Sequence, residues 1–170
     1  MTEHEEYLKK ELMDAAKNWL AIDGLWFLAI EERYGLETAI SCDVKVWKDF
    51  SKIEADRIKK RLHLPETGTL DDLEKALHHR LFCYLDEYTI KRPDKNTLEI
   101  FMQTCRTQTA RTRKNLPLFP CKKIGIVDYE TFARQINPAI RTECISCPPD
   151  PRPDSYFCGW RFTLLETTIS

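Results

Sequence analysis

The residues with the clearest chemical potential are cysteines, and five of the seven lie between positions 105 and 158. Cys144 and Cys147 form a Cys-x-x-Cys pair, Cys158 follows a proline-rich connector, and Cys105 ends a segment with strand-like alternation. Thiolates from neighbouring strand ends can build the tetrahedral sulfur site that zinc favours. Four thiolates can also hold an iron–sulfur cluster. The spacing therefore predicts zinc bound by Cys105, Cys144, Cys147 and Cys158, with an iron–sulfur cluster as the alternative.

That metal site needs a local irregularity, because Cys144 and Cys147 would face opposite sides of a regular strand. Cys121 is either a substitute metal ligand or a free thiol whose pKa is lowered by the two lysines that follow it. In the second case it is a candidate catalytic nucleophile. Cys42 and Cys83 fall in helical segments and are expected to be buried core residues.

Three charged residues fall inside the apolar arcs of predicted helices: Asp23, Glu54 and Arg80. A buried charge is too costly to persist unpaired, so we expect these side chains to meet. One interpretation is a structural ion-pair network between three helices. The other is a ligand pocket contacted by Asp23, Trp26, Glu54 and Arg80, with Glu54 or Asp23 as general base.

The charge along the chain is uneven, although the net charge is only −1. Residues 106–123 hold six basic residues and no acidic one. This run is either a solvated surface or the mouth of a pocket that attracts an anionic ligand.

The predicted secondary structure that positions these residues changes from helices to mainly strands near position 85. Apolar residues recur at helical spacing up to that point, and Gly24 could divide the first helix. The predicted helices cover residues 8–34, 37–62, 69–84 and 128–136, and 106–115 is a short basic helix or loop. Alternation predicts strands at 85–91, 97–104, 140–147 and 156–165. The expected fold is α+β: one domain over 1–170, with a helical layer of three or more helices (1–84) packed on an antiparallel sheet of about four strands (85–170).

Composition excludes several classes of protein. A hydrophobic content of 42% is too high for a disordered chain. The net charge favours no nucleic-acid partner, and no apolar run reaches the 18 or so residues of a membrane span. The acidic start resembles no targeting signal, so a cytoplasmic location is expected. Phosphate-binding loops and the motifs of serine hydrolases and zincins are absent from the sequence.

The cysteine pattern, with the Phe157 to Phe162 segment and the stretch from Asp23 to Gly35, resembles a small prokaryotic cytosolic family of unknown function. That family is allied to the 2-amino-thiazoline-4-carboxylate hydrolases. Cys105, Cys121 and Cys158 match the cysteine positions of the hydrolases, whereas Ile124 and Gly159 stand where those enzymes have Asp. The chain is more distantly similar to four-vinyl-reductase-type ligand-binding domains. The resemblance implies an α+β ligand-binding fold with a metal.

These observations predict a zinc-binding domain that binds or senses a small molecule. If the basic run forms the mouth of the pocket, the ligand is expected to be anionic. The alternatives are a hydrolase of a small cyclic amide or amidine, such as an aminothiazoline carboxylate, and an iron–sulfur or redox protein. In the hydrolase, Cys121 or a metal-bound water would attack the substrate. We expect a small-molecule partner, and no nucleic acid or membrane. A homodimer and the question of enzyme or binding protein both stay open.

Overall fold

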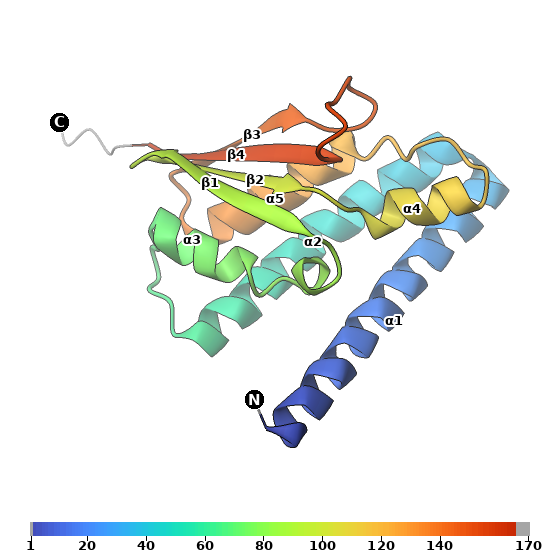
Figure 1. Ribbon diagram of the computed structural model, residues 1–170. Helices are drawn as coiled ribbons and strands as arrows, with labels where there is room; N and C mark the ends of the chain where they lie inside the picture. Colours follow the sequence, from blue (N-terminus) through green and yellow to red (C-terminus); the bar gives the residue numbers. More distant parts are fainter. Residues whose placement is uncertain (1, 166–170) are drawn as a thin grey trace.

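A computed structural model describes residues 2–165, and its fold is α+β, as the sequence predicts. The chain begins with two long helices, α1 (Glu3–Tyr34) and α2 (Leu36–Leu62), joined by Gly35 alone. Gly35 has φ 84°, a left-handed conformation that glycine adopts without strain, and this reverses the chain in one residue. Helix α1 continues through Gly24 without a break. Its first half projects beyond the body, so the apolar side chains of Tyr7 and Leu8 are exposed (Figure 1).

The third helix is shorter than its sequence pattern suggests. Thr69 and Asp72 form the predicted capping box, in which each side chain accepts a hydrogen bond from the other residue's backbone N–H. Helix α3 (Leu70–Leu77) then ends, and a short 3-10 helix, η1 (Leu81–Tyr84), follows it. The change of direction between them brings Arg80 into the interior, where it is fully buried.

Four antiparallel strands form one sheet in the order β1-β2-β4-β3. They are β1 (Tyr88–Asp94), β2 (Thr97–Met102), β3 (Ile140–Ser146) and β4 (Cys158–Leu164). Between β2 and β3 lie α4 (Arg106–Arg113) and α5 (Lys122–Ile136). Helix α5 begins six residues before the predicted start at 128, because residues 122–127 continue its helical turns and Gly125 does not interrupt them.

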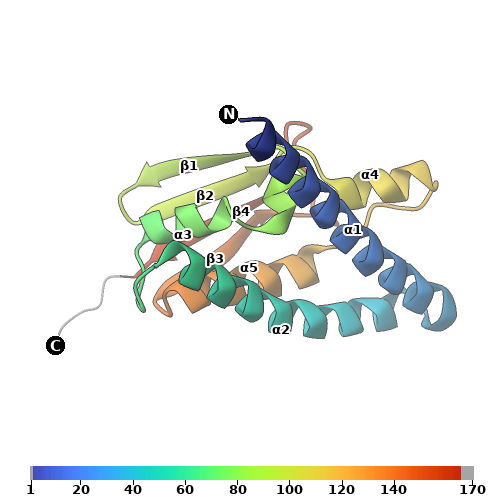
Figure 2. The same cartoon turned by 90° about the horizontal axis from the view of Figure 1, so that it is seen from below.

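The helices lie along one face of the sheet (Figures 1 and 2). The core forms where α5 and α3 meet that face, around Leu98, Ile100, Phe132, Trp160 and Phe162. On the outer face the directly opposed residues Glu99 and Arg161 form a 2.8 Å ion pair. The open end of this arrangement, where β2 and β4 meet α4 and the start of α5, carries most of the cysteines.

Candidate functional site

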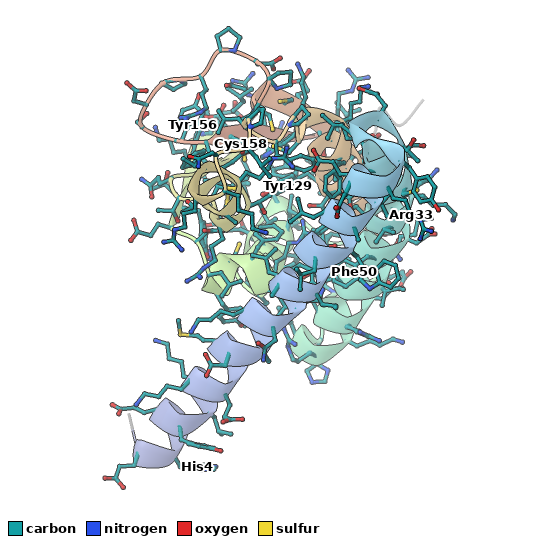
Figure 3. All side chains as sticks on the ribbon, turned by 90° about the vertical axis from the view of Figure 1, so that its right-hand side faces the viewer. His4, Arg33, Phe50, Tyr129, Tyr156 and Cys158 are labelled. Carbon is teal, nitrogen blue, oxygen red and sulfur yellow. The ribbon has the colours of Figure 1, made fainter. Side chains whose placement is uncertain are left out.

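A cavity of about 620 Å³ lies between α1, α2, α4, α5 and one end of the sheet. Four of its lining residues carry thiols: Cys105, Cys121, Cys147 and Cys158. Four others carry carboxyl groups: Asp23, Asp43, Asp86 and Asp128. Aromatic rings complete the wall, contributed by Trp19, Phe27, Trp47, Phe82, Phe119, Tyr129 and Trp160. Figure 3 looks at this end of the molecule and shows Tyr129 and Cys158 between α4 and α1. The cavity therefore combines nucleophiles, titratable groups and apolar surface.

A β-bulge in β3 assembles the thiols. Cys144 pairs with Trp160, but Ser146 pairs with Gly159, so two steps on β3 match one step on β4. The extra residue reverses the side-chain alternation and turns Cys147 toward the face on which Cys158 lies. Cys147 consequently makes thiol hydrogen bonds with both Cys158 and Cys121. This is the irregularity that the Cys-x-x-Cys spacing required.

Cys121 is the N-cap residue of α5, and two donors surround its sulfur. Its Sγ lies 3.4 Å from Cys147 Sγ and 3.5 Å from the side-chain Nε2 of Gln108. The hydrogen bond with Cys147 lowers the pKa of Cys121, and burial opposes this effect while the Gln108 bond adds to it. The flanking lysines are not the cause that the sequence suggested, because Lys122 pairs with Asp150 and Lys123 with Glu37. The thiolate is stabilised by hydrogen bonds instead.

Gln108 is held rigidly in this role. It is buried, its Nε2 donates to Phe119 O at 2.9 Å, and its Oε1 accepts from Phe119 N at 2.8 Å. Both ends of its amide group are thus fixed by the loop that precedes α5. Sequence analysis did not single out Gln108, and no pattern in the sequence pointed to it.

The other cysteines have a different character. Burial raises the pKa of Cys83 and of Cys105 to about 12, and that of Cys144 to about 11. Hydrogen bonds to Cys121 and Cys158 raise the pKa of Cys147. Cys42 is exposed, so the expectation of a buried core residue is wrong for it, whereas Cys83 is half-buried. Within residues 2–165, no three His, Cys, Asp or Glu side chains are arranged to hold a metal ion. The zinc set of Cys105, Cys144, Cys147 and Cys158 stays a prediction.

Two carboxyl groups of the cavity lining, Asp23 on α1 and Asp43 on α2, lie near each other. Burial, followed by the nearby charge of Asp23, raises the pKa of Asp43 to about 7. Burial also raises the pKa of Asp23. Sequence analysis missed Asp43, although it lies three residues after Ile40 and four before Trp47 in the same apolar arc. The helical-wheel argument that selected Glu54 would have found it.

Arg80 forms a buried ion-pair network that borders the cavity through Asp128. Its Nε donates to Glu54 Oε2 at 2.8 Å, and its Nη2 donates to Asp128 Oδ1 at 2.6 Å. The guanidinium lies between the rings of Phe82 and Phe132, at 4.4 and 4.3 Å from their centroids. Of the three charged residues expected to meet, Arg80 and Glu54 do so, whereas Arg80 bonds Asp128 in place of Asp23.

Three of the four predicted ligand contacts lie outside the cavity lining. Both Glu54 carboxylate oxygens accept hydrogen bonds, from Arg80 and from the backbone N–H of Leu81. Trp26 is 67% exposed on the outer side of α1. Among the described residues that line the cavity, Asp23 is present, whereas Trp26, Glu54 and Arg80 are not. The carboxyl groups that α1, α2 and α5 bring to the cavity are those of Asp23, Asp43 and Asp128.

Comparison with known protein families shows to which family the chain belongs. Residues 2–164 match DUF6125, a family of unknown function. The chain belongs to this family. No curated protein matches the sequence. Because DUF6125 has no assigned activity, the resemblance to aminothiazoline hydrolases and four-vinyl-reductase domains stays a prediction.

Helix α4 gives the cavity of this DUF6125 protein a basic side. Arg106, Arg111, Arg113 and Lys114 all line it. Arg111 is held by two bonds to Glu31, at 2.7 and 3.1 Å, while Arg106 donates to Leu85 O. Chemically, the site can therefore hold charges of both signs near Cys121, the thiol whose pKa is lowered. None of the helices in the described part of the chain is long and apolar enough to cross a membrane.

Proposed function

We propose that this DUF6125 protein binds a small molecule that carries both a cationic and an anionic group. The observation that carries the proposal is the cavity itself, whose lining has carboxyl groups from α1, α2 and α5 and basic side chains from α4. Its volume of about 620 Å³ lies within the range of about 300–1,000 Å³ usual for ligand pockets. Aromatic side chains between the charged groups supply apolar contact.

The acidic side supports the recognition of a cation. Burial disfavours the charged forms of Asp23 and Asp43, and repulsion from the charge of Asp23 adds to this at Asp43, whose pKa is raised to about 7. A bound ammonium or amidinium group would relieve this repulsion and favour ionised Asp43. Binding of the cation should therefore strengthen as the pH rises through 7.

The basic side supports recognition of the anionic group. Arg111 is already paired with Glu31, so we assign this role to Arg113 and Lys114 at the end of α4. Their long side chains can approach a carboxylate without being buried themselves.

The test is calorimetric titration with a set of small zwitterionic amino acids, their amides and their N-acetyl derivatives. We expect the zwitterions to bind and each derivative, which keeps one charge only, to lose at least about tenfold in affinity. Asp43→Asn should weaken the zwitterions and amides, and Arg113→Ala should weaken the zwitterions and N-acetyl derivatives. Asp49→Asn, on the exposed side of α2, is the matched control and should bind like the wild type. Absence of binding at millimolar concentration would refute the proposal. Binding that neither Asp43→Asn nor Arg113→Ala weakens would also refute it.

A hydrolase acting on a non-peptide C–N bond is the second candidate. It is favoured by the presence of a thiol with lowered pKa, Cys121, in the same cavity as a carboxyl group with a pKa of about 7, Asp43. A nucleophile and an acid–base group of these kinds suit acyl transfer from a cyclic amidine. Turnover of an aminothiazoline carboxylate that Cys121→Ser abolishes would support it, and turnover retained by that variant would exclude Cys121 as nucleophile.

A further inference from the structure

We propose that Cys121 and Cys147 form a redox-active dithiol that reduces small-molecule disulfides and closes into an intramolecular disulfide. The proposal concerns the thiol end of the cavity and does not depend on the charged ligand proposed above. It begins from the contact between two cysteines that come from different elements, the start of α5 and the end of β3.

The two sulfurs are already close to bonding distance. Cys121 Sγ and Cys147 Sγ lie 3.4 Å apart, and the S–S bond of a disulfide is about 2.05 Å long. Each sulfur would therefore move by less than about 1 Å to form the bond. The backbones beside the two cysteines are also joined, because Lys122 N donates to Pro148 O at 3.0 Å. Closing the bond therefore needs side-chain rotation and no rearrangement of α5 against β3.

The surroundings assign different roles to the two thiols. Cys121 is partly exposed and faces the cavity, with hydrogen bonds from Cys147 and from the fixed amide of Gln108 to its sulfur. Cys147 is 1% exposed, so an external disulfide reaches Cys121 first. Cys121 is thus the attacking thiol and Cys147 the resolving thiol.

The reaction proceeds in two exchange steps. The Cys121 thiolate attacks one sulfur of the external disulfide, forms a mixed disulfide, and releases the other half as a thiolate. Cys147 gives its proton to that leaving thiolate, and its own thiolate then attacks Cys121 Sγ and displaces the second half, which takes a proton from water. Two protein thiols are oxidised, one disulfide is reduced to two thiols, and two electrons pass between them.

A neighbouring thiol provides the matched control. Cys144 lies in β3, three residues before Cys147, and is not among the described residues that line the cavity. If the dithiol is Cys121–Cys147, Cys144→Ser should still close it.

The test uses the full-length protein and oxidised glutathione. The wild type should lose two hydrogens by intact-mass analysis, release two glutathione molecules per chain, and give a peptide map that joins Cys121 to Cys147. Cys147→Ser should stop at a stable glutathione adduct on Cys121, and Cys121→Ser should react at least about tenfold more slowly. The wild-type peptide map needs no variant, so a folding defect in Cys147→Ser leaves the proposal testable.

Three outcomes would overturn it. The map could join a different pair of cysteines, or glutathione could accumulate only on the exposed Cys42. Metal analysis of untagged protein, made on the same sample, could instead find about one zinc per chain that must be chelated before the thiols react, which would favour the zinc prediction.

Discussion

Two groups of charged side chains sit side by side in this protein and behave in opposite ways. In the network of Arg80, Glu54 and Asp128, each charge has an oppositely charged partner within 2.8 Å. In the cavity, Asp23 and Asp43 face each other, and burial raises the pKa of both carboxyl groups. Glu54 and Arg80 of the first group, and Asp23 and Asp43 of the second, fall in apolar arcs of the sequence. Position on a helical wheel therefore does not separate a structural charge from a functional one. What separates them is the partner that tertiary packing supplies.

The largest expected effect is on the paired network. Arg80→Met should destabilise the protein by about 3–5 kcal/mol, because it leaves Glu54 and Asp128 buried without a counter-charge. Arg92→Met is the matched control, since Arg92 also bonds two carboxylates, Asp71 and Glu74, but at a partly exposed site. It should cost about 1 kcal/mol or less. Urea unfolding measures both values, and equal losses would show that the burial of the network does not matter.

A smaller effect of the opposite sign is expected at Asp43, whose buried carboxyl group lies near the charge of Asp23. The folded-state pKa of Asp43, about 7, lies above its ordinary value of 3.8, so the folded protein holds this proton more tightly than the unfolded chain does. Asp43 therefore costs nothing below about pH 4, and its destabilisation grows up to pH 7 and is complete above it. Asp43→Asn should stabilise the protein by on the order of 1–2 kcal/mol at pH 8, after allowance for its partial exposure.

At pH 4 the same substitution should change the free energy of unfolding very little. Asp49→Asn is the control, because Lys45 lowers the pKa of that exposed carboxyl group. A stabilisation by Asp43→Asn that is the same at pH 4 and pH 8 would mean that the charge of Asp43 is not its cause.

The smallest expected effect is kinetic. Cys121 should be alkylated by iodoacetamide at neutral pH at least about tenfold faster than Cys83 or Cys105. Its pKa is lowered by hydrogen bonds, whereas burial raises theirs to about 12. Labelling is followed by peptide mass analysis, and Gln108→Leu should slow the modification of Cys121 without slowing that of Cys83. If Cys121 reacts no faster than Cys105, hydrogen bonding does not activate it.

The sequence alone determined the elements and part of the ion-pair network. Helical spacing located α1 and α2, alternation located the strands, and the Thr69–Asp72 spacing predicted the cap of α3. These patterns succeed because hydrogen bonds within a helix, and side-chain alternation along a strand, are local in the chain. The cost of an unpaired buried charge was enough to pair Arg80 with Glu54.

Tertiary structure decided which other groups meet. Only the packing of α2 against α5 brings Asp128 to Arg80, and only the hairpin at Gly35 sets Asp43 opposite Asp23. The bulge after Cys144 turns Cys147 toward Cys121, which lies 26 residues earlier in the chain. Side chains far apart in sequence meet according to which faces of their elements pack together. A local pattern can show that a charge or thiol needs a partner, but the partner is chosen by the packing.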